Sequence, residues 1–146
     1  MEYPYRVGMV IKRLSNLLRR QIHMDVTGCE DGRPIGMQGW ILRYLVENRD
    51  RPLYQRDVES QFNIRRSTAT GILNAMEENG LIRRENVAAD GRLKRIALTA
   101  RAEELDQLVR RRIDQVEANL VRGLSQEEIE AFLATAEKIR RNIEGD

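Results

Sequence analysis

Polar and basic side chains gather on one side of a short stretch near the middle of the chain. They can hydrogen-bond the edges of bases and the oxygens of phosphates, and they are Arg66, Ser67, Thr70 and Asn74. Apolar side chains recur at helical spacing in the same stretch, at Ala69, Ile72, Leu73 and Met76. The pattern predicts an amphipathic helix whose outer face suits a nucleic acid. The alternative is an ordinary solvated face on a core helix, which is common.

A basic hairpin is predicted directly after this helix. Gly80 ends the helix, and the runs Leu81–Val87 and Lys94–Leu98 are typical of strands because of their isoleucine and valine content. Ala88–Gly91 supplies the turn between the two strands. A polar, cationic helix followed at once by a cationic hairpin is the layout of a winged helix-turn-helix. In that layout the helix enters a DNA major groove, and the hairpin reaches the neighbouring backbone or the minor groove.

The composition fits a mostly helical protein. The 146 residues are 41% hydrophobic, 33% charged and only 5% aromatic, which allows one compact domain, or one domain with long dimerisation helices. The formal net charge of +2 does not by itself indicate nucleic acid. Arginine outnumbers lysine, however, and its planar guanidinium suits two-pronged contacts to phosphate and guanine.

The cellular compartment is inferred from the cysteine content and the hydropathy pattern. The single cysteine, Cys29, leaves no partner for an intramolecular disulfide, and a reducing cytoplasm is the default for such a chain. The sequence shows no charged-then-apolar leader and no apolar run of membrane-spanning length. We therefore expect a cytoplasmic protein without a membrane partner.

The remainder of the chain is predicted to be helical, apart from short connections. Helices are expected over residues 5–26, 37–48, 55–62 and 99–122. Leu53 begins a very short strand, and Ser125 with Glu128 forms a capping box for a last helix. The apolar stripe expected on the 99–122 helix consists of Leu105, Leu108, Val109, Val116 and Leu120. The predicted fold class is mainly α with a small β-hairpin wing.

Four short pieces follow one another in the central region at fixed spacing: Ser67–Leu73, Met76–Arg84, Asp90–Arg92 and Ile96–Thr99. Together they closely resemble the MarR family of bacterial transcription regulators. The remaining helices fit that family in number, order and length, so the resemblance covers essentially the whole chain. The sequence departs from the family at Tyr54, where a Ser or Thr often caps a helix, and at Ala102, where a glycine is common.

Apolar stripes on the first helix and on the last two helices favour a homodimer. The core of a winged helix-turn-helix cannot cover three further long stripes, whereas a second copy about a two-fold axis can. The resemblance implies the same arrangement, because MarR-like regulators are dimers joined through their first and last helices. We expect an N-terminal dimerisation helix and loop (1–36), a DNA-binding lobe (37–98) and C-terminal dimerisation helices (99–146). Such a dimer would place its two recognition helices about one DNA turn, roughly 34 Å, apart.

The residues expected to contact double-stranded DNA lie on the predicted helix and hairpin. They are Arg65, Arg66, Ser67, Thr68, Thr70, Asn74, Arg84, Asp90, Arg92 and Lys94. Arg66 suits guanine, whereas Thr68 and Thr70 suit phosphates or thymine methyl groups. Lys94 suits a phosphate.

The roles at the tip of the hairpin follow from the resemblance. In MarR-like proteins the arginine of an Asp-x-Arg motif reaches the minor groove and the aspartate braces it, which implies these roles for Arg92 and Asp90. At the base of the hairpin, period-two alternation cannot say whether Arg83 or Arg84 faces the DNA.

A small-molecule site is suggested by Met37, Trp40 and Tyr44. MarR-like proteins often bind small aromatic acids between the dimerisation helices and the DNA-binding lobe, and these side chains could line such a cavity. Aromatic and methionine side chains at helical spacing are also typical of an ordinary core. Both interpretations stay open at this point.

Cys29 and His23 are the remaining candidates for chemistry. Some MarR-like regulators use an N-terminal cysteine to sense peroxide, but the negative charges of Glu30 and Asp31 disfavour a reactive thiolate at Cys29. His23 is the only histidine and has too few potential co-ligands for a metal site. We expect no metal and no cofactor.

We expect a sequence-specific DNA-binding transcriptional regulator, a homodimeric repressor that binds a pseudo-palindromic operator and is released by a small-molecule effector. One alternative is a thiol-based redox regulator that acts through Cys29; another is a winged helix used for protein contacts. Protein contacts would favour apolar or acidic residues on the helix face, whereas Arg65, Arg66 and Arg92 are cationic. An enzyme is not expected, because the sequence has no nucleophile elbow, phosphate-binding glycine loop or metal cluster.

Overall fold

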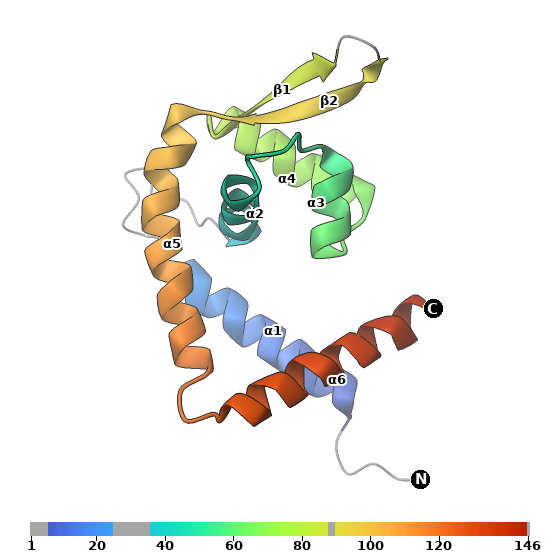
Figure 1. Ribbon diagram of the computed structural model, residues 1–146, viewed down its shortest axis with the longest axis vertical. Helices are drawn as coiled ribbons and strands as arrows, with labels where there is room; N and C mark the ends of the chain where they lie inside the picture. Colours follow the sequence, from blue (N-terminus) through green and yellow to red (C-terminus); the bar gives the residue numbers. More distant parts are fainter. Residues whose placement is uncertain (1–5, 25–35, 88–89, 146) are drawn as a thin grey trace. The chain divides into compact units, whose positions relative to one another are not determined.

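The computed structural model describes residues 6–24, 36–87 and 90–145. Within these residues the elements are α1 (Val7–Met24), α2 (Gly36–Glu47), α3 (Gln55–Phe62), α4 (Arg66–Glu78), β1 (Ile82–Val87), β2 (Asp90–Leu98), α5 (Ala100–Leu120) and α6 (Gln126–Glu144) (Figure 1). This confirms the predicted fold class, six helices with one antiparallel hairpin in the described part of the chain. The predicted helix bounds agree to within two residues, and residues 5, 25 and 26 of the first predicted helix lie outside the described ranges.

The chain divides into two compact units, Met1–Ile113 and Asp114–Asp146. The first unit holds α1 to β2 and most of α5, and the second holds the end of α5 and α6. In the described part of the chain, no helix combines the length and the apolar character needed to span a bilayer.

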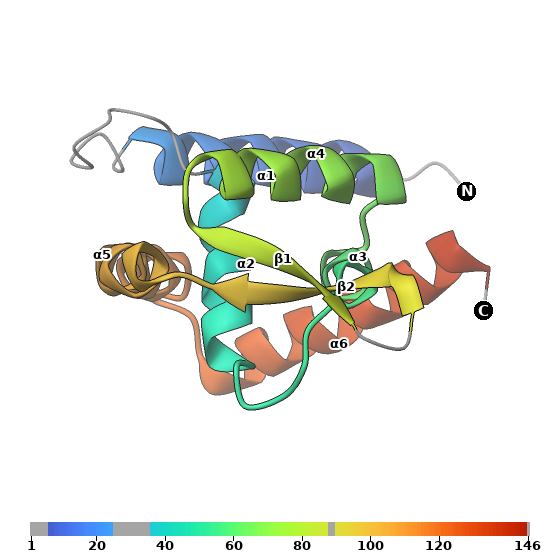
Figure 2. The ribbon, with the colours of Figure 1, turned by 90° about the horizontal axis from the view of Figure 1, so that it is seen from above.

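The hydrophobic core of the first unit lies among α2, α3, α4, the base of the hairpin and the part of α5 that belongs to this unit. Its fully buried large side chains include Ile41, Leu42, Leu45, Val58, Leu73 and Met76. The helices α2 and α4 contact each other and cross at a steep angle (Figure 2). Ala69, Leu73 and Met76 are fully buried and Ile72 is partly buried, which confirms the predicted apolar face of α4. The opposite face of α4 is therefore turned outward.

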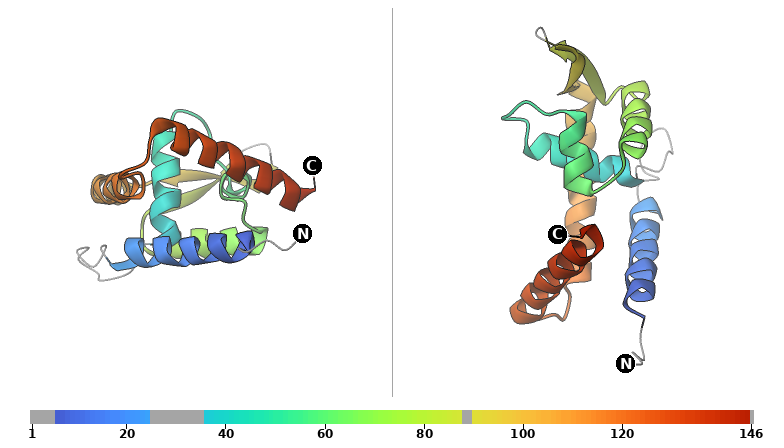
Figure 3. Two further views of the ribbon diagram at one scale, coloured as in Figure 1. Left: turned by 90° about the horizontal axis from the view of Figure 1, so that it is seen from below. Right: turned by 90° about the vertical axis from the view of Figure 1, so that its right-hand side faces the viewer.

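The hairpin β1–β2 projects beyond α3 and α4 (Figure 3). Its pairing runs from Ile82 opposite Leu98 to Val87 opposite Asp90, with an irregularity between Asn86 and Val87. The prediction that Asp90 and Gly91 belong to the turn is wrong, because β2 already begins at Asp90. The register shifts between Asn86 and Val87, so that Val87 pairs with Asp90 and the strand includes Asp90 and Gly91, although both residues locally favour a turn.

A third short segment ties the base of the hairpin to the start of α3. The Ile96 N–H donates to the Leu53 carbonyl at 2.8 Å, and Tyr54 forms an isolated antiparallel bridge with Arg95. The short strand expected to begin at Leu53 is therefore present only as an isolated bridge at Tyr54. Tyr54 is also the residue before α3, and its N–H donates to the Asp57 carboxylate at 2.8 Å. The helix start is thus stabilised from Asp57, although Tyr54 itself is neither Ser nor Thr.

The helix boundaries follow local capping signals. After α4, Gly80 adopts a left-handed conformation with φ of +72°. The Thr99 hydroxyl donates to the Gly80 carbonyl at 2.6 Å and accepts from the Ala102 N–H at 3.2 Å at the start of α5. The capping box predicted before α6 is confirmed: the Glu128 N–H donates to Ser125 Oγ at 3.1 Å, and the Ser125 N–H donates to the Glu128 carboxylate at 2.7 Å.

A mostly buried ion pair joins α2 to α5 inside the first unit. Arg43 Nη1 donates to both carboxylate oxygens of Asp106, at 3.0 and 2.9 Å, and the two side chains are only 16% and 11% exposed. Arg43 Nη2 also lies 3.0 Å from the Glu47 carboxylate. Burial would lower the pKa of Arg43, but the hydrogen bonds and charge of Asp106, together with Glu47, raise it.

Candidate nucleic-acid interface

The outer face of α4 carries several of the residues predicted to contact DNA. Ser67, Thr68, Gly71 and Asn74 are exposed there, on the side opposite the buried Ala69 and Leu73. The 3.6-residue period of the helix places these exposed positions on one face. The packing of α4 in the core therefore fixes which side chains it presents outward.

The start of α4 is open to an anion. Arg65 precedes the helix in an extended conformation, and its side chain makes no capping hydrogen bond. The first turn contains no acidic residue, and Arg65 and Arg66 are exposed. The unpaired N–H groups and the positive end of the helix dipole therefore coincide with two cationic side chains, an arrangement that suits a phosphate.

Thr70 is held by a neighbouring helix. Its hydroxyl donates to the Arg66 carbonyl at 2.8 Å and accepts from Gln55 Nε2 at 2.9 Å. Gln55 Nε2 also lies 3.3 Å from the same carbonyl oxygen. Gln55, the first residue of α3, was missed by the sequence analysis, because a contact fifteen residues away leaves no periodic signal. It locks α3 to α4 beside the outward face.

Arg84 lies against α4, at the base of the hairpin. Its guanidinium donates to Asn74 Oδ1 and lies 3.6 Å from the Glu77 carboxylate. The backbone N–H of Arg84 donates to the same carboxylate at 2.9 Å. The Arg84 side chain is only 18% exposed, whereas Arg83 is exposed. Because arginine only donates, the oxygen of Asn74 is engaged and its amide N–H groups remain for an outside acceptor.

The hairpin carries further residues predicted to contact DNA. Lys94 is exposed and pairs across the ladder with Asn86. The backbones of Asp90 and Arg92 belong to β2, but their side chains lie outside the described part of the structure. Their expected roles at the wing tip therefore stay predictions.

Comparisons with known proteins decide the family. A family profile described as "MarR family" matches residues 35–93. The transcription regulator MarR from Oenococcus oeni PSU-1 is 30% identical to this chain, over 97% of this chain and 100% of its own, with a TM-score of 0.77. The chain belongs to the MarR family. It is thus a transcription regulator with a winged-helix DNA-binding fold.

Two crystal structures of MepR from S. aureus are similar to this MarR-family chain. A MepR–DNA complex is 23% identical, covers 97% of this chain and 99% of its own, and gives a TM-score of 0.84. MepR in a DNA-binding conformation is 25% identical, covers 95% and 99%, and gives a TM-score of 0.81. The similarity extends over the whole fold rather than over the central lobe alone.

The residues proposed to bind an effector in this MarR-family protein are divided between core and surface. Trp40 and Tyr44 are half-buried and pack against the hydrophobic core, whereas Met37 is exposed. The Tyr44 ring meets Phe62 edge-on at 5.8 Å, and its hydroxyl accepts from Arg51 at 2.9 Å. The core interpretation accounts for these contacts, and effector binding stays a prediction.

Metal and thiol chemistry have few candidates in the described part of this MarR-family chain. Within those residues, no cluster of three or more His, Cys, Asp or Glu side chains could hold a metal ion. Cys29 and the His23 side chain lie outside the described part.

Proposed function

We propose that the protein is a homodimeric repressor that binds a pseudo-palindromic operator in double-stranded DNA and is released by a small-molecule effector. The observation that carries this proposal is the exposed, cationic N-terminal half of α4 beside a projecting hairpin. MepR, whose fold is similar, has been crystallised in complex with DNA. That similarity supports DNA as the partner of this surface.

In this proposal α4 enters the major groove. Arg66 reads a guanine, Arg65 contacts phosphate, and the open first turn with Ser67 and Thr68 binds the same backbone. Asn74 donates to an acceptor in the groove, since its oxygen is held by Arg84. Arg84 then acts by orienting Asn74, in addition to any contact of its own.

The hairpin contacts the flanking DNA. Arg92 enters the minor groove and Asp90 braces it, as the family resemblance implies, while exposed Lys94 binds phosphate. In this proposal residues 37–98 form the DNA-binding lobe, because they contain α4 and the hairpin.

The first and last helices serve dimerisation. Apolar side chains on α1 and α6 are exposed in the single chain, including Val10, Leu14, Leu17, Phe132, Leu133 and Ile143. Patches of this kind favour association, and a second copy about a two-fold axis would cover the same patches on both chains. Residues 1–36 and 99–146 would then form the dimerisation region, with the two α4 helices roughly 34 Å apart.

Release from DNA would follow from binding of a small aromatic effector near Met37, Trp40 and Tyr44. These side chains belong to α2, which packs against α4. A ligand that displaced α2 would move the recognition helix, and its differential affinity for the two arrangements would set the size of the effect.

A binding experiment on the upstream intergenic DNA of the protein's own gene tests the proposal. The labelled fragment competes with a random duplex of equal length at two salt concentrations, and the complex is then footprinted. We expect preference for the specific fragment, a two-fold symmetric footprint, and reduced transcription in vitro from the bound promoter. The proposal would be contradicted if the protein bound neither this fragment nor duplexes selected from a random library more tightly than random DNA.

Arg92→Ala tests the role of the hairpin. We expect operator binding to weaken by about 1–3 kcal/mol, because a charged contact in the narrow groove is lost. Ser67→Ala should cost less than Arg92→Ala, because the lost hydroxyl is an uncharged donor and water can take its place at the phosphate. Titration of the labelled operator measures both, and equal affinity of Arg92→Ala and wild type would refute the wing assignment.

A further inference from the structure

Gly71 occupies the middle of the exposed face of α4. Ser67 and Thr68 lie one turn before it and Asn74 one turn after, and all of them are exposed. Within the described part of the chain, no heavy atom lies within 4 Å of the place where a Cβ on Gly71 would stand, apart from its chain neighbours and its own helix backbone. The described fold leaves room for a side chain here.

A glycine at this place weakens the helix. Glycine is less favourable than alanine in a helix interior, because the unfolded chain gains more conformational freedom. Gly71 does not have a positive φ, so alanine could adopt the same backbone conformation. The benefit of the missing side chain is that another molecule can approach the helix backbone closely.

The chemistry that Gly71 offers to such a molecule is apolar. Inside α4 its N–H and C=O take part in the hydrogen bonds of the helix, so only the Cα methylene faces outward. A phosphate would find no donor there. In the major groove, the apolar group on the edge of a base is the 5-methyl group of thymine.

The adjacent Thr70 supports the same partner. Its hydroxyl hydrogen is donated to the Arg66 carbonyl and one of its lone pairs accepts from Gln55, which leaves the γ-methyl group and a single lone pair. Thr70 therefore has no hydrogen to donate to a phosphate or to guanine while these bonds hold.

We propose that Gly71 is the point at which α4 comes closest to the operator, and that Gly71 and the Thr70 methyl group recognise a thymine through its 5-methyl group. This inference rests on the proposed function and names one base that the recognition helix reads. Gln55 is a positioning residue in this arrangement, because it holds the Thr70 hydroxyl against the Arg66 carbonyl.

Gly71→Ala separates stability from recognition. Duplexes selected from a random library by the wild-type protein supply the operator. We expect the melting temperature of the variant to rise by roughly 1–4 °C and its operator affinity to fall by about tenfold or more. Its affinity for random duplex should stay unchanged, because phosphate contacts remain. A variant that binds the operator as tightly as wild type would overturn the inference.

Gly8→Ala is the matched control. Gly8 lies in α1 on the polar side shared with Lys12 and Ser15, and within the described residues a Cβ there would also meet no atom within 4 Å. It adds the same methyl group to a helical glycine away from α4. We expect it to raise the melting temperature similarly. Because α1 belongs to the proposed dimerisation region, operator affinity is compared at protein concentrations at which both the variant and wild type are dimers, and it should then be unchanged.

Replacement of single operator thymines by uracil identifies the base. Wild type should lose about fourfold affinity at one position of each half-site, the value of one buried methyl group. Gly71→Ala should instead prefer uracil at that position, since removal of the DNA methyl makes room for the added one. Identical uracil profiles for the two proteins would overturn the thymine assignment. Failure of wild type to distinguish any selected duplex from random DNA would contradict the proposed function itself.

Discussion

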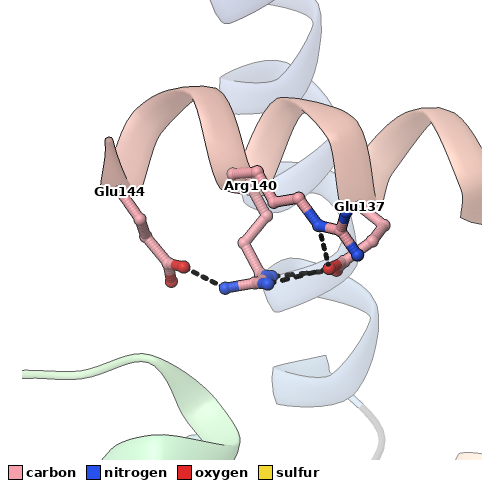
Figure 4. A network of polar contacts seen from close by, with 4 residues as sticks. Glu137, Arg140 and Glu144 are labelled. Atoms are coloured by element: carbon pink, nitrogen blue, oxygen red, sulfur yellow. Dashed lines mark hydrogen bonds and ion pairs between the residues drawn. The ribbon is translucent and has the colours of Figure 1, made fainter. Parts of the chain in front are cut away.

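Two arginines of α6 hold the carboxylate of Glu137 in its ionised form. Arg140 Nη2 lies 2.8 Å and Arg141 Nε 3.1 Å from the same Glu137 oxygen, and Arg140 also pairs with Glu144 (Figure 4). These pairs sit at the three- and four-residue spacings at which helical side chains meet. The hydrogen bonds from Arg140 and then Arg141 lower the pKa of Glu137 from 4.5 to about 2.

The Glu137 carboxyl group should therefore titrate near pH 2. Because its pKa is lower in the folded chain, the ion pairs contribute stability that is fully present above pH 4.5 and is lost as the pH falls to about 2. An NMR titration of the side-chain carboxyl carbon measures this. Arg140→Gln should move the midpoint toward 4.5, whereas a wild-type midpoint already at 4.5 would contradict the expectation.

At the scale of elements, the pair Arg43–Asp106 connects α2 with α5. Asp106→Ala should lower the free energy of unfolding by about 3 kcal/mol, because it leaves the mostly buried Arg43 with Glu47 as its remaining acidic partner at the site. The double variant Arg43→Met, Asp106→Leu should recover most of this loss. Chemical denaturation at one fixed protein concentration measures the change.

An exposed ion pair provides the matched control. Arg49 Nη1 lies 3.0 Å from the Glu103 carboxylate, and both side chains are exposed. Arg49→Ala should therefore cost less than about 1 kcal/mol. If it destabilises the protein as much as Asp106→Ala does, burial is not the reason for the strength of the inner pair.

Local capping signals made several elements predictable. The end of α3 at Phe62 follows from Asn63, which adopts a left-handed conformation with φ of 50°. The helix α6 was predictable for the same reason, through Ser125 and Glu128. In these cases the residues that decide the structure lie within four positions of one another.

Contacts between distant residues could not be read from the sequence. Of the apolar stripe predicted on α5, Val109 and Val116 are buried, whereas Leu108 and Leu120 are exposed in the single chain. The charged Asp106 is buried, which the sequence did not predict. Asp106 occupies an inward position because its partner Arg43 comes from α2, sixty-three residues away. The contact of Arg84 with Asn74 likewise depends on how the strand crosses the helix, which alternation along one strand cannot specify.

At the scale of the whole molecule, Phe132 tests the proposed dimer. It is 63% exposed on α6, and a symmetric dimer would bury it twice. Phe132→Glu should raise the dimer dissociation constant by about 100-fold or more, since burial of each phenyl ring contributes about 1.5–3 kcal/mol. Operator affinity should fall with it. Analytical ultracentrifugation over a range of concentrations measures the change.

Lys138→Glu is the control for this substitution, because it places a carboxylate on a polar, exposed position of the same helix. It should leave the dimer intact. A wild-type protein that stays monomeric at micromolar concentrations would contradict the expected dimer.

Arg84 contacts Asn74 and Glu77, so the base of the hairpin and the recognition helix α4 are coupled and should shift together when either one is displaced. Base preferences measured under the helix and under the wing should then be interdependent. The energetic effect of a base change below one part depends on the sequence below the other. A scoring scheme that adds independent contributions from each operator base pair will therefore give the wrong affinity for operators changed both below α4 and below the hairpin.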